Sequence, residues 1–247
     1  NFIDGQVINL GLLDIVQSTQ IENGGRVLDL RDSAVSIAAG KTLTVTGGGS
    51  VVVGHTVVGG SGTLQLAGTQ TLDLAADLVL PSGGITLAPT GTVTVEGPGA
   101  LINEGNTLTI GSDTINADFI NIGTATVSAS STFVDVDNQG TLRVVASSGV
   151  NQSTIEALAN TGTVIIEATG VSSAADAALK VGSGFTNEGL IELRGFGSWN
   201  NTATLIMGSG VLTNASKGVL RGAGNNSGTG NFIDGQVINL GLLDIVQ

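Results

Sequence analysis

Apolar and polar residues alternate in short stretches of this chain, and many of these stretches follow an asparagine, a variable residue and a glycine. In residues 138–144, NQGTLRV, the alternation places Leu142 and Val144 on one face and Thr141 and Arg143 on the other. Asn and Gly tolerate the left-handed backbone of a tight turn. Each motif therefore predicts a turn followed by a short strand.

The Asn-x-Gly motif recurs at intervals that fit the coils of a β-solenoid. Its asparagines are Asn9, Asn103, Asn121, Asn138, Asn160, Asn187 and Asn239, and Asn214 is a degenerate member whose glycine is delayed to Gly218. From Asn103 onward the separations are 18, 17, 22, 27, 27 and 25 residues. Strands this short must hydrogen-bond to the coils above and below. We expect the asparagines to serve as plain turn residues or as an internal ladder of stacked amides.

The first half of the chain keeps the alternation without the asparagine. Residues 41–45, 62–66, 84–87 and 91–95 each indicate a turn and then a strand. Only residues 172–181 could form a helical turn, and an excursion between coils is an equal alternative. The pattern predicts an all-β fold: a parallel, right-handed β-solenoid with about ten coils in 230 residues, at about 22 residues per coil.

The two ends of the chain carry the same sequence. Residues 1–17 and residues 231–247 both read NFIDGQVINLGLLDIVQ. A folding constraint alone would not preserve exposed positions such as Gln6 and Gln236. We therefore expect residues 1–230 to be one complete tandem-repeat unit and residues 231–247 to begin the next identical repeat, as one continuous solenoid.

Charge and composition exclude some partners. The net charge is −12, and the eight Lys and Arg residues form no run. The sequence thus lacks the basic patch that nucleic-acid binding requires, and it would be repelled by an anionic membrane. No apolar run approaches the roughly 18 residues of a membrane span. Cysteine is absent and only 3% of residues are aromatic, so the core must be built from Val, Leu, Ile and Ala.

The recurring strand start consists of Asn-x-Gly, then Thr, then Leu or Val, then a variable residue and Val. It resembles the strand start of a class of bacterial giant adhesins. These have right-handed β-helix passengers and include filamentous-haemagglutinin-type and autotransporter proteins. The resemblance extends along the whole chain as a pattern. It implies secretion, a place at the cell surface, and adhesion, aggregation or fibre building. The chain departs from that class in lacking a secretion domain and an anchor, and in its irregular coil lengths.

Carboxylate pairs and the single histidine are the candidates for catalysis or metal binding. Asp135 and Asp137 should point out of one strand face about 7 Å apart, which could suit calcium or acid–base chemistry. A solvated face explains them better, because only Arg143 lies nearby in the sequence. The pairs Asp29 with Asp32 and Asp73 with Asp77 have no better support, and His55 has no second histidine or cysteine to complete a zinc site. We predict no catalytic residue, no cofactor and no metal.

Two features could bind a surface ligand. Phe196, Trp199, Asn200 and Asn201 lie in one unusual segment that could stack on a sugar, although covering an irregular corner is the simpler interpretation. Thr-x-Thr pairs at 42/44, 92/94, 107/109 and 124/126 could contribute to an ice-binding plane, but ordinary strand propensity explains them.

Exact repetition favours a structural or adhesive fibre, since each copy adds reach or valency. We expect an extracellular or cell-surface protein whose partners are neighbouring identical repeats, end to end, with self-association into filaments and a host-surface or glycan ligand as further partners. The alternatives are a glycan- or ice-binding module and a polysaccharide-active β-helix enzyme.

Overall fold

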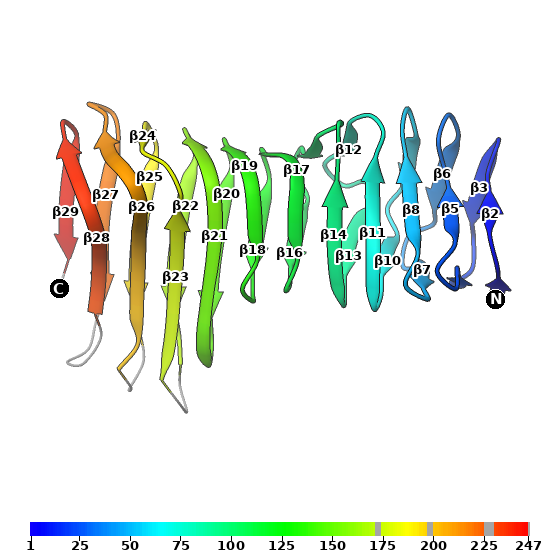
Figure 1. Ribbon diagram of the computed structural model, residues 1–247, viewed down its shortest axis with the longest axis horizontal. Coiled ribbons are helices and arrows are strands. Elements are labelled where there is room, and N and C mark those ends of the chain that lie inside the picture. The colour runs from blue at the N-terminus through cyan, green and yellow to red at the C-terminus, as the bar shows by residue number, and fades with distance from the viewer. Residues whose placement is uncertain (171–173, 197–199, 225–229, 247) are drawn as a thin grey trace. The chain divides into compact units, whose positions relative to one another are not determined.

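The computed structural model describes residues 1–170, 174–196, 200–224 and 230–246 (Figure 1). These residues form strands and turns. They include no helix, and so none that is long and apolar enough to cross a membrane. The chain divides into two compact units, Asn1–Gly123 and Thr124–Gln247.

The first unit is a parallel β-solenoid with three sheets. One sheet contains β1 (Phe2–Asp4), β4 (Thr19–Glu22), β7 (Thr42–Thr46), β10 (Thr63–Leu66) and β13 (Thr86–Pro89). The second contains β2 (Val7–Ile8), β5 (Val27–Asp29), β8 (Ser50–Val53), β11 (Thr69–Leu74), β14 (Thr92–Glu96) and β17 (Thr114–Asn121), joined by β12 (Leu78–Leu80) and β15 (Leu101–Asn103). The third contains β3 (Leu12–Ile15), β6 (Ala34–Ile37) and β9 (Val57–Gly60). Strand β16 (Thr107–Ile110) lies against β13.

The second unit is a parallel β-solenoid with two sheets. One contains β19 (Thr132–Asn138), β21 (Gly149–Asn160), β23 (Ala175–Val181), β26 (Thr202–Asn214) and β28 (Gly230–Asn239), with β24 (Phe185–Asn187) between β21 and β26. The other contains β18 (Thr124–Val127), β20 (Thr141–Ala146), β22 (Thr163–Ala168), β25 (Leu190–Gly195), β27 (Val219–Gly224) and β29 (Leu242–Val246).

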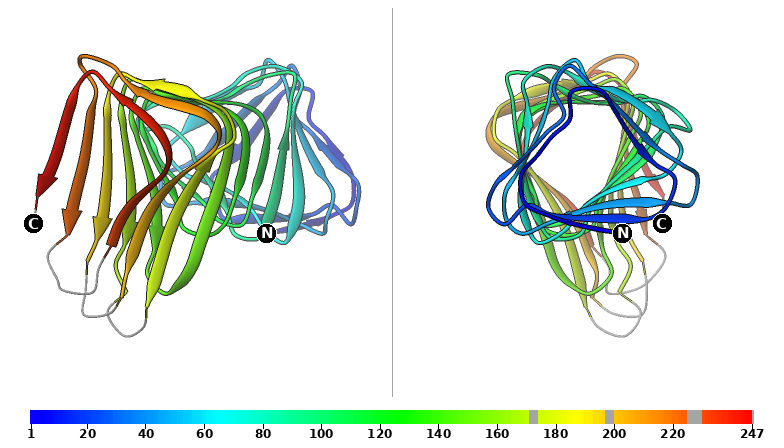
Figure 2. Two further views of the ribbon diagram at one scale, coloured as in Figure 1. Left: turned by 60° about the vertical axis from the view of Figure 1, so that its left-hand side comes forward. Right: turned by 90° about the vertical axis from the view of Figure 1, so that its right-hand side faces the viewer.

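Both units wind in the right-handed sense. In Figure 1 the nearer strands, such as β8 in the first unit and β26 in the second, run upwards while the chain advances from right to left. Successive coils pair in parallel, and Figure 2 shows the same stacking within each unit from two further sides. The chain makes about ten turns. The predicted all-β, parallel β-solenoid is confirmed.

The alternating pattern sorts the side chains as the sequence predicts. Leu142 and Val144 are buried, whereas Thr141 and Arg143 are partly exposed. Inward side chains stack on inward side chains of the next coil, since Val144 pairs with Ile166. Each coil therefore contributes one layer of aliphatic side chains to a core that runs inside the unit.

The segment with helical potential is a strand where it is described. Residues 175–181 form β23, which pairs with β21 and β26, so the helical interpretation and the excursion are both wrong there. Residues 171–173 lie outside the described residues.

Glycine corners distinguish the first unit from the second. Between its first and second sheets the chain turns at Gly24–Gly25, Gly47–Gly48 and Gly68, all with positive φ between +56° and +101°. Such a backbone conformation is readily adopted only by glycine. In the second unit β21 runs for 12 residues with no such glycine after its first residue. Strand β26 runs for 13 residues with one such glycine, Gly210 at φ +77°, where its register against β28 shifts and the strand continues. The sequence pattern did not predict this change from three sheets to two.

The glycines of the Asn-x-Gly motifs serve a different purpose from the one that the sequence suggested. Gly162 and Gly189 do not have positive φ, so the expected left-handed turn is wrong for them. A Cβ added at Gly189 would lie 2.0 Å from the carbonyl oxygen of Gly162 in the preceding coil. Glycine is required here because two coils approach closely, with no room for a side chain between them.

We expect Gly189→Ala to lower the free energy of unfolding by about 2 kcal/mol or more, because the backbones of two coils must separate to admit the methyl group. Urea denaturation followed by circular dichroism measures this change. Gly222→Ala in β27 is the matched control, since its Cβ would meet nothing closer than Ile245 Cδ1 at 3.6 Å. Equal losses in the two variants would contradict the close-approach explanation.

Candidate functional site

Asparagine side chains form a hydrogen-bonded ladder along one edge of the second unit. Each is the last residue of a strand, and the Nδ2 group of each donates to Oδ1 of the asparagine in the next coil. The four distances are 2.8 Å from Asn138 to Asn160, 2.7 Å from Asn160 to Asn187, 2.8 Å from Asn187 to Asn214 and 2.7 Å from Asn214 to Asn239. In the first unit, Asn103 donates to Asn121 in the same way at 2.9 Å. The ladder is therefore present, and Asn214, which looked degenerate, is a full member.

The ladder is buried from Asn138 to Asn214, and these amides are paired, whereas Asn239 at its end is exposed. Asn187 and Asn214 are 0% exposed, and Asn160 is 1% exposed. The Asn187 side chain also donates to the carbonyl of Gly189 at 3.0 Å, at the start of the following turn. Because a buried amide without partners would be costly, this pairing holds each turn in register with the next coil. From Asn138 to Asn214 the amides are used within the fold, and their role is structural.

Other buried polar residues stabilise corners that the motif does not mark. Asn151 lies inside β21, where its Nδ2 donates to the carbonyls of Val127 at 3.0 Å and Val145 at 2.9 Å. Its Oδ1 accepts a hydrogen bond from the Ser153 hydroxyl at 3.0 Å. Asn23 in the first unit accepts from the Gly49 amide at 3.1 Å. These residues were missed, although a polar residue at an inward position of the alternation would have indicated them.

Asp113 is a buried acid in the first unit that sequence reasoning also missed. Its carboxylate accepts from the amides of Val93 and Gly111, each at 2.8 Å. Burial raises the pKa of Asp113 above its usual value, and the two hydrogen bonds offset only part of this effect. The Asp113 carboxylate thus accepts from two backbone amides the hydrogen bonds that a backbone carbonyl of a neighbouring coil would otherwise accept.

The predicted aromatic surface is wrong for one of its residues. Asn201 is 0% exposed, and its side chain is used within the fold, donating to the carbonyls of Gly170 at 2.9 Å and Phe196 and accepting from the Ala175 amide at 2.9 Å. Phe196 is half-buried and Asn200 is exposed, whereas Trp199 lies outside the described residues. Asn201 therefore stabilises the corner and is not part of a ligand-binding surface.

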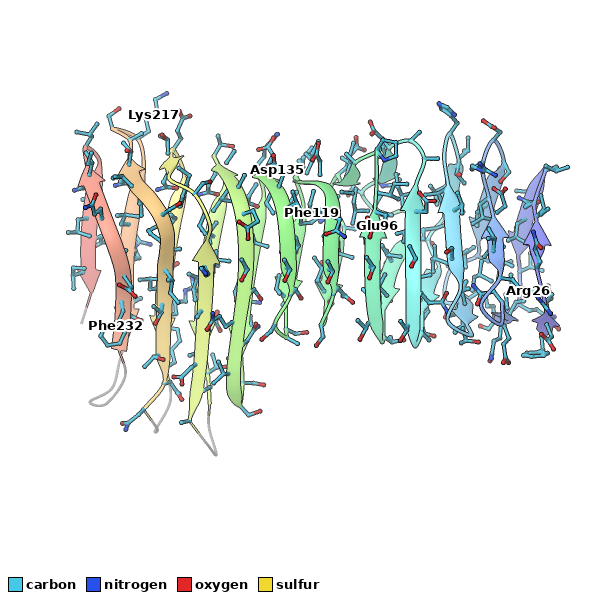
Figure 3. The ribbon with its side chains drawn as sticks, in the orientation of Figure 1. Arg26, Glu96, Phe119, Asp135, Lys217 and Phe232 are labelled. Atoms are coloured by element: carbon cyan, nitrogen blue, oxygen red, sulfur yellow. The ribbon has the colours of Figure 1, made fainter. Side chains whose placement is uncertain are left out.

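Asp135 and Asp137 point outward from β19 as predicted, but they meet no charged partner in β21. They pair with Ala157 and Ala159 of β21. Asp137 accepts a hydrogen bond from Gln139 at 2.8 Å. Asp135, labelled in Figure 3, lies at a shallow open groove of about 460 Å³ whose lining also includes Glu188 but no Lys, Arg or His. The groove thus places two carboxylates on one surface without a cationic group beside them.

The remaining candidates for metal or acid–base chemistry are surface features. His55 Nδ1 lies 3.4 Å from Asp32 Oδ1, both side chains are more than 80% exposed, and both residues have positive φ at corners. Asp29 is bound by Arg31 at 2.6 Å, and this hydrogen bond lowers the pKa of Asp29 despite the opposing effect of burial. Within the described part of the chain, no three His, Cys, Asp or Glu residues are placed to hold a metal ion.

Several of the few basic residues connect neighbouring coils on the outside of the second unit. Glu167 in β22 accepts from Arg143 in β20 at 2.9 Å and lies 3.5 Å from Arg194 in β25. Arg221 in β27 bonds Asp244 in β29 at 2.9 Å. These cations are thus used within the fold, between coils.

Outward threonines do not extend into a continuous plane. Thr69 and Thr71 of β11 lie beside Thr92 and Thr94 of β14. In the next coil on one side, Thr71 pairs with Ser50 of β8. On the other side Thr94 pairs with Thr114 of β17, so the rank reaches three strands with a single threonine in the third. It is much smaller than the flat array expected of an ice-binding face.

The fold and its buried ladder define this chain as a parallel β-solenoid built from stacked coils. Comparison with protein-family models, with curated proteins and with solved structures finds no match to the chain in any of the three.

We expect Asn160→Asp to break the ladder, because a carboxylate loses both amide donors and faces the Oδ1 atom of Asn187. Stability at pH 7 should fall by about 3 kcal/mol, the order of cost for a buried unpaired charge. Burial would raise the pKa of the introduced carboxyl group, so the loss should be small below the unfolded pKa of about 4 and grow as the pH rises through that value.

Urea denaturation between pH 3 and pH 8 tests this dependence. Asn200→Asp places the same group at an exposed position and should leave stability nearly unchanged at every pH. A loss at Asn160 that does not vary with pH would contradict burial of the amide.

Proposed function

We propose that the chain is a segment of a tandemly repeated structural protein that is exposed outside the cell and provides an adhesive scaffold. The observation that carries this proposal is the 17-residue sequence that occurs at residues 1–17 and again at residues 231–247. Both copies form a coil of the solenoid, and they do so at equivalent positions.

The two copies form strands over matching residues, although the first copy is divided between two sheets where the second copy is one strand. Strands β1 and β2 correspond to parts of β28, and β3 corresponds to residues 242–245 of β29. Both copies bend at the equivalent glycine, since Gly5 has φ +128° and Gly235 has φ +148°. A sequence that forms strands over the same residues at both places fits a unit that begins again every 230 residues.

Each copy is paired on a different side, and this supports stacking of one repeat on the next. Residues 1–17 pair with the coil that follows them, through β4, β5 and β6. Residues 231–247 pair with the coil that precedes them, through β26 and β27. Together the two copies provide both halves of a repeat junction, and a long array would contain the complete junction.

An adhesive scaffold also fits the composition. A long core of aliphatic side chains needs no cysteine, which suits a protein that folds after export. Exact copies increase reach and the number of contact points, whereas catalysis needs one site. The resemblance to giant bacterial adhesins points in the same direction.

The location of the protein tests the role outside the cell. Antibodies raised against residues 1–247 should label intact cells of the source organism, and protease added outside should remove most of the label. Cells that lack the coding region should adhere less to surfaces or to each other. Label that appears only after cells are opened would overturn the proposal.

A single substitution, Ile245→Asp, tests separately whether one repeat stacks on the next. In the chain of 247 residues Ile245 is 64% exposed, so we expect a change within about 0.5 kcal/mol. In a chain extended by a second repeat, the following coil should cover it as it covers Ile15, which is 4% exposed. The same substitution should then cost about 2 kcal/mol or more in urea denaturation. Equal effects in both chains would contradict a continuous junction.

A further inference from the structure

Two coils of this chain are covered on one side by the same 17-residue sequence. Residues 1–17 cover the coil formed by β4, β5 and β6, which we name the first acceptor face. Residues 231–247 cover the coil formed by β26 and β27, the second acceptor face. We propose that the two copies are exchangeable between molecules, so that an acceptor face left uncovered in one chain binds the free side of the copy in a second chain.

The first acceptor face binds its copy through main-chain and apolar contacts. The Gly5 amide donates to the Glu22 carbonyl at 2.9 Å, and the Ala38 amide donates to the Ile15 carbonyl at 3.0 Å. Ile15 lies beside Ile37, and both are buried. Every atom used by residues 1–17 here is also present in residues 231–247, because the sequences are identical.

The second acceptor face binds its copy through a different set of contacts. The Asn214 side chain donates to Asn239 at 2.7 Å, and Arg221 bonds Asp244 at 2.9 Å. Leu220 lies beside Leu243 in the paired strands. The two acceptor faces contact opposite sides of the 17-residue coil, so one copy can be bound by both at once.

The exposed fractions of matching residues in the two copies show which side chains of the second copy have no neighbouring coil to cover them. Ile15 is 4% exposed beneath the first acceptor face, whereas its counterpart Ile245 is 64% exposed. Leu13 is partly buried beneath the same face, whereas its counterpart Leu243 is 54% exposed. Phe232, labelled in Figure 3, does not differ in this way, because both it and its counterpart Phe2 are more than half exposed. The surface that would bury Ile245 is therefore already known from the same chain: it is the first acceptor face of another molecule.

The intact chain restrains this exchange, because each acceptor face is covered by a copy that is tethered to it. A tethered segment acts at an effective concentration in the millimolar range, which a second molecule at micromolar concentration cannot match. Loosening residues 1–17 uncovers the first acceptor face, and the second copy of a neighbouring molecule then fills it. Chains linked in this way associate head to tail.

This inference rests on the proposed stacking of repeats and names its partner, a second copy of this chain. A matched set of full-length variants tests it. In Ile15→Asp the first copy can no longer be buried and the second copy is intact, so its mass in sedimentation velocity should rise at least about twofold over the unchanged chain at micromolar concentration. In Ile245→Asp only the free side of the second copy is altered, so the mass should equal that of the unchanged chain.

The double variant Ile15→Asp with Ile245→Asp decides whether the association is specific. It keeps the uncovered face but lacks a segment that can fill it, and it should not associate beyond the unchanged chain. A folded Ile15→Asp chain that fails to associate would overturn the proposal. Association of the double variant to the same extent would also overturn it, because general apolar stickiness would then be the cause.

A second measurement does not depend on folding of the variants. Gln17 and Ser18 are exposed, so a protease site placed between them can be cut after the chain has folded. Removal of the released peptide should produce head-to-tail association, and a peptide of residues 1–17 added back in excess should reverse it. A peptide carrying Ile15→Asp should have no effect. Cut chains that stay single after the peptide is removed would contradict exchange, whereas labelling of intact cells tests the role outside the cell independently.

Discussion

The hydrogen bonds between successive coils are the interaction on which this structure depends. In both units the parallel strands find their backbone partners in neighbouring coils. The spacing between coils is therefore fixed by backbone hydrogen bonding at roughly 4.8 Å. Side chains at the corners must fit that spacing, and this requirement explains both the glycines and the asparagines of the recurring motif.

The motif does two things at one corner. Its glycine lets neighbouring backbones approach, as at Gly189 against Gly162. Its asparagine converts the same close approach into a side-chain hydrogen bond, as between Asn160 and Asn187. A larger residue in place of the glycine, or a residue without an amide in place of the asparagine, would disturb the spacing that the strands require. Packing of aliphatic layers inside the coils is then possible, because inward positions such as Val144 and Ile166 are held opposite each other.

Much of this architecture could be predicted from the sequence, because its physical causes are local and repeated. Alternation identified the strands, and the spacing of asparagines identified the coil and the ladder. The reason assigned to the motif glycines was wrong for Gly162 and Gly189, since a close approach between coils has no signal in a single coil. The change from three sheets to two was missed because the prediction followed the strands and assigned no corner to glycine pairs such as Gly47–Gly48. Asn201 was placed on the surface because its neighbours are unusual, whereas its partners, Gly170 and Ala175, lie in the preceding coil.

The identity of the two 17-residue copies has a consequence for the gene. In the proposed array the coil that they form must fit two different neighbours, so a substitution in this sequence has to satisfy both sides of the junction. Recombination that adds or removes 230 residues in register would leave the same contacts at each junction that remains. The length of an array could thus change by whole units between generations without altering any part of its core, and selection on reach could act without selection on folding.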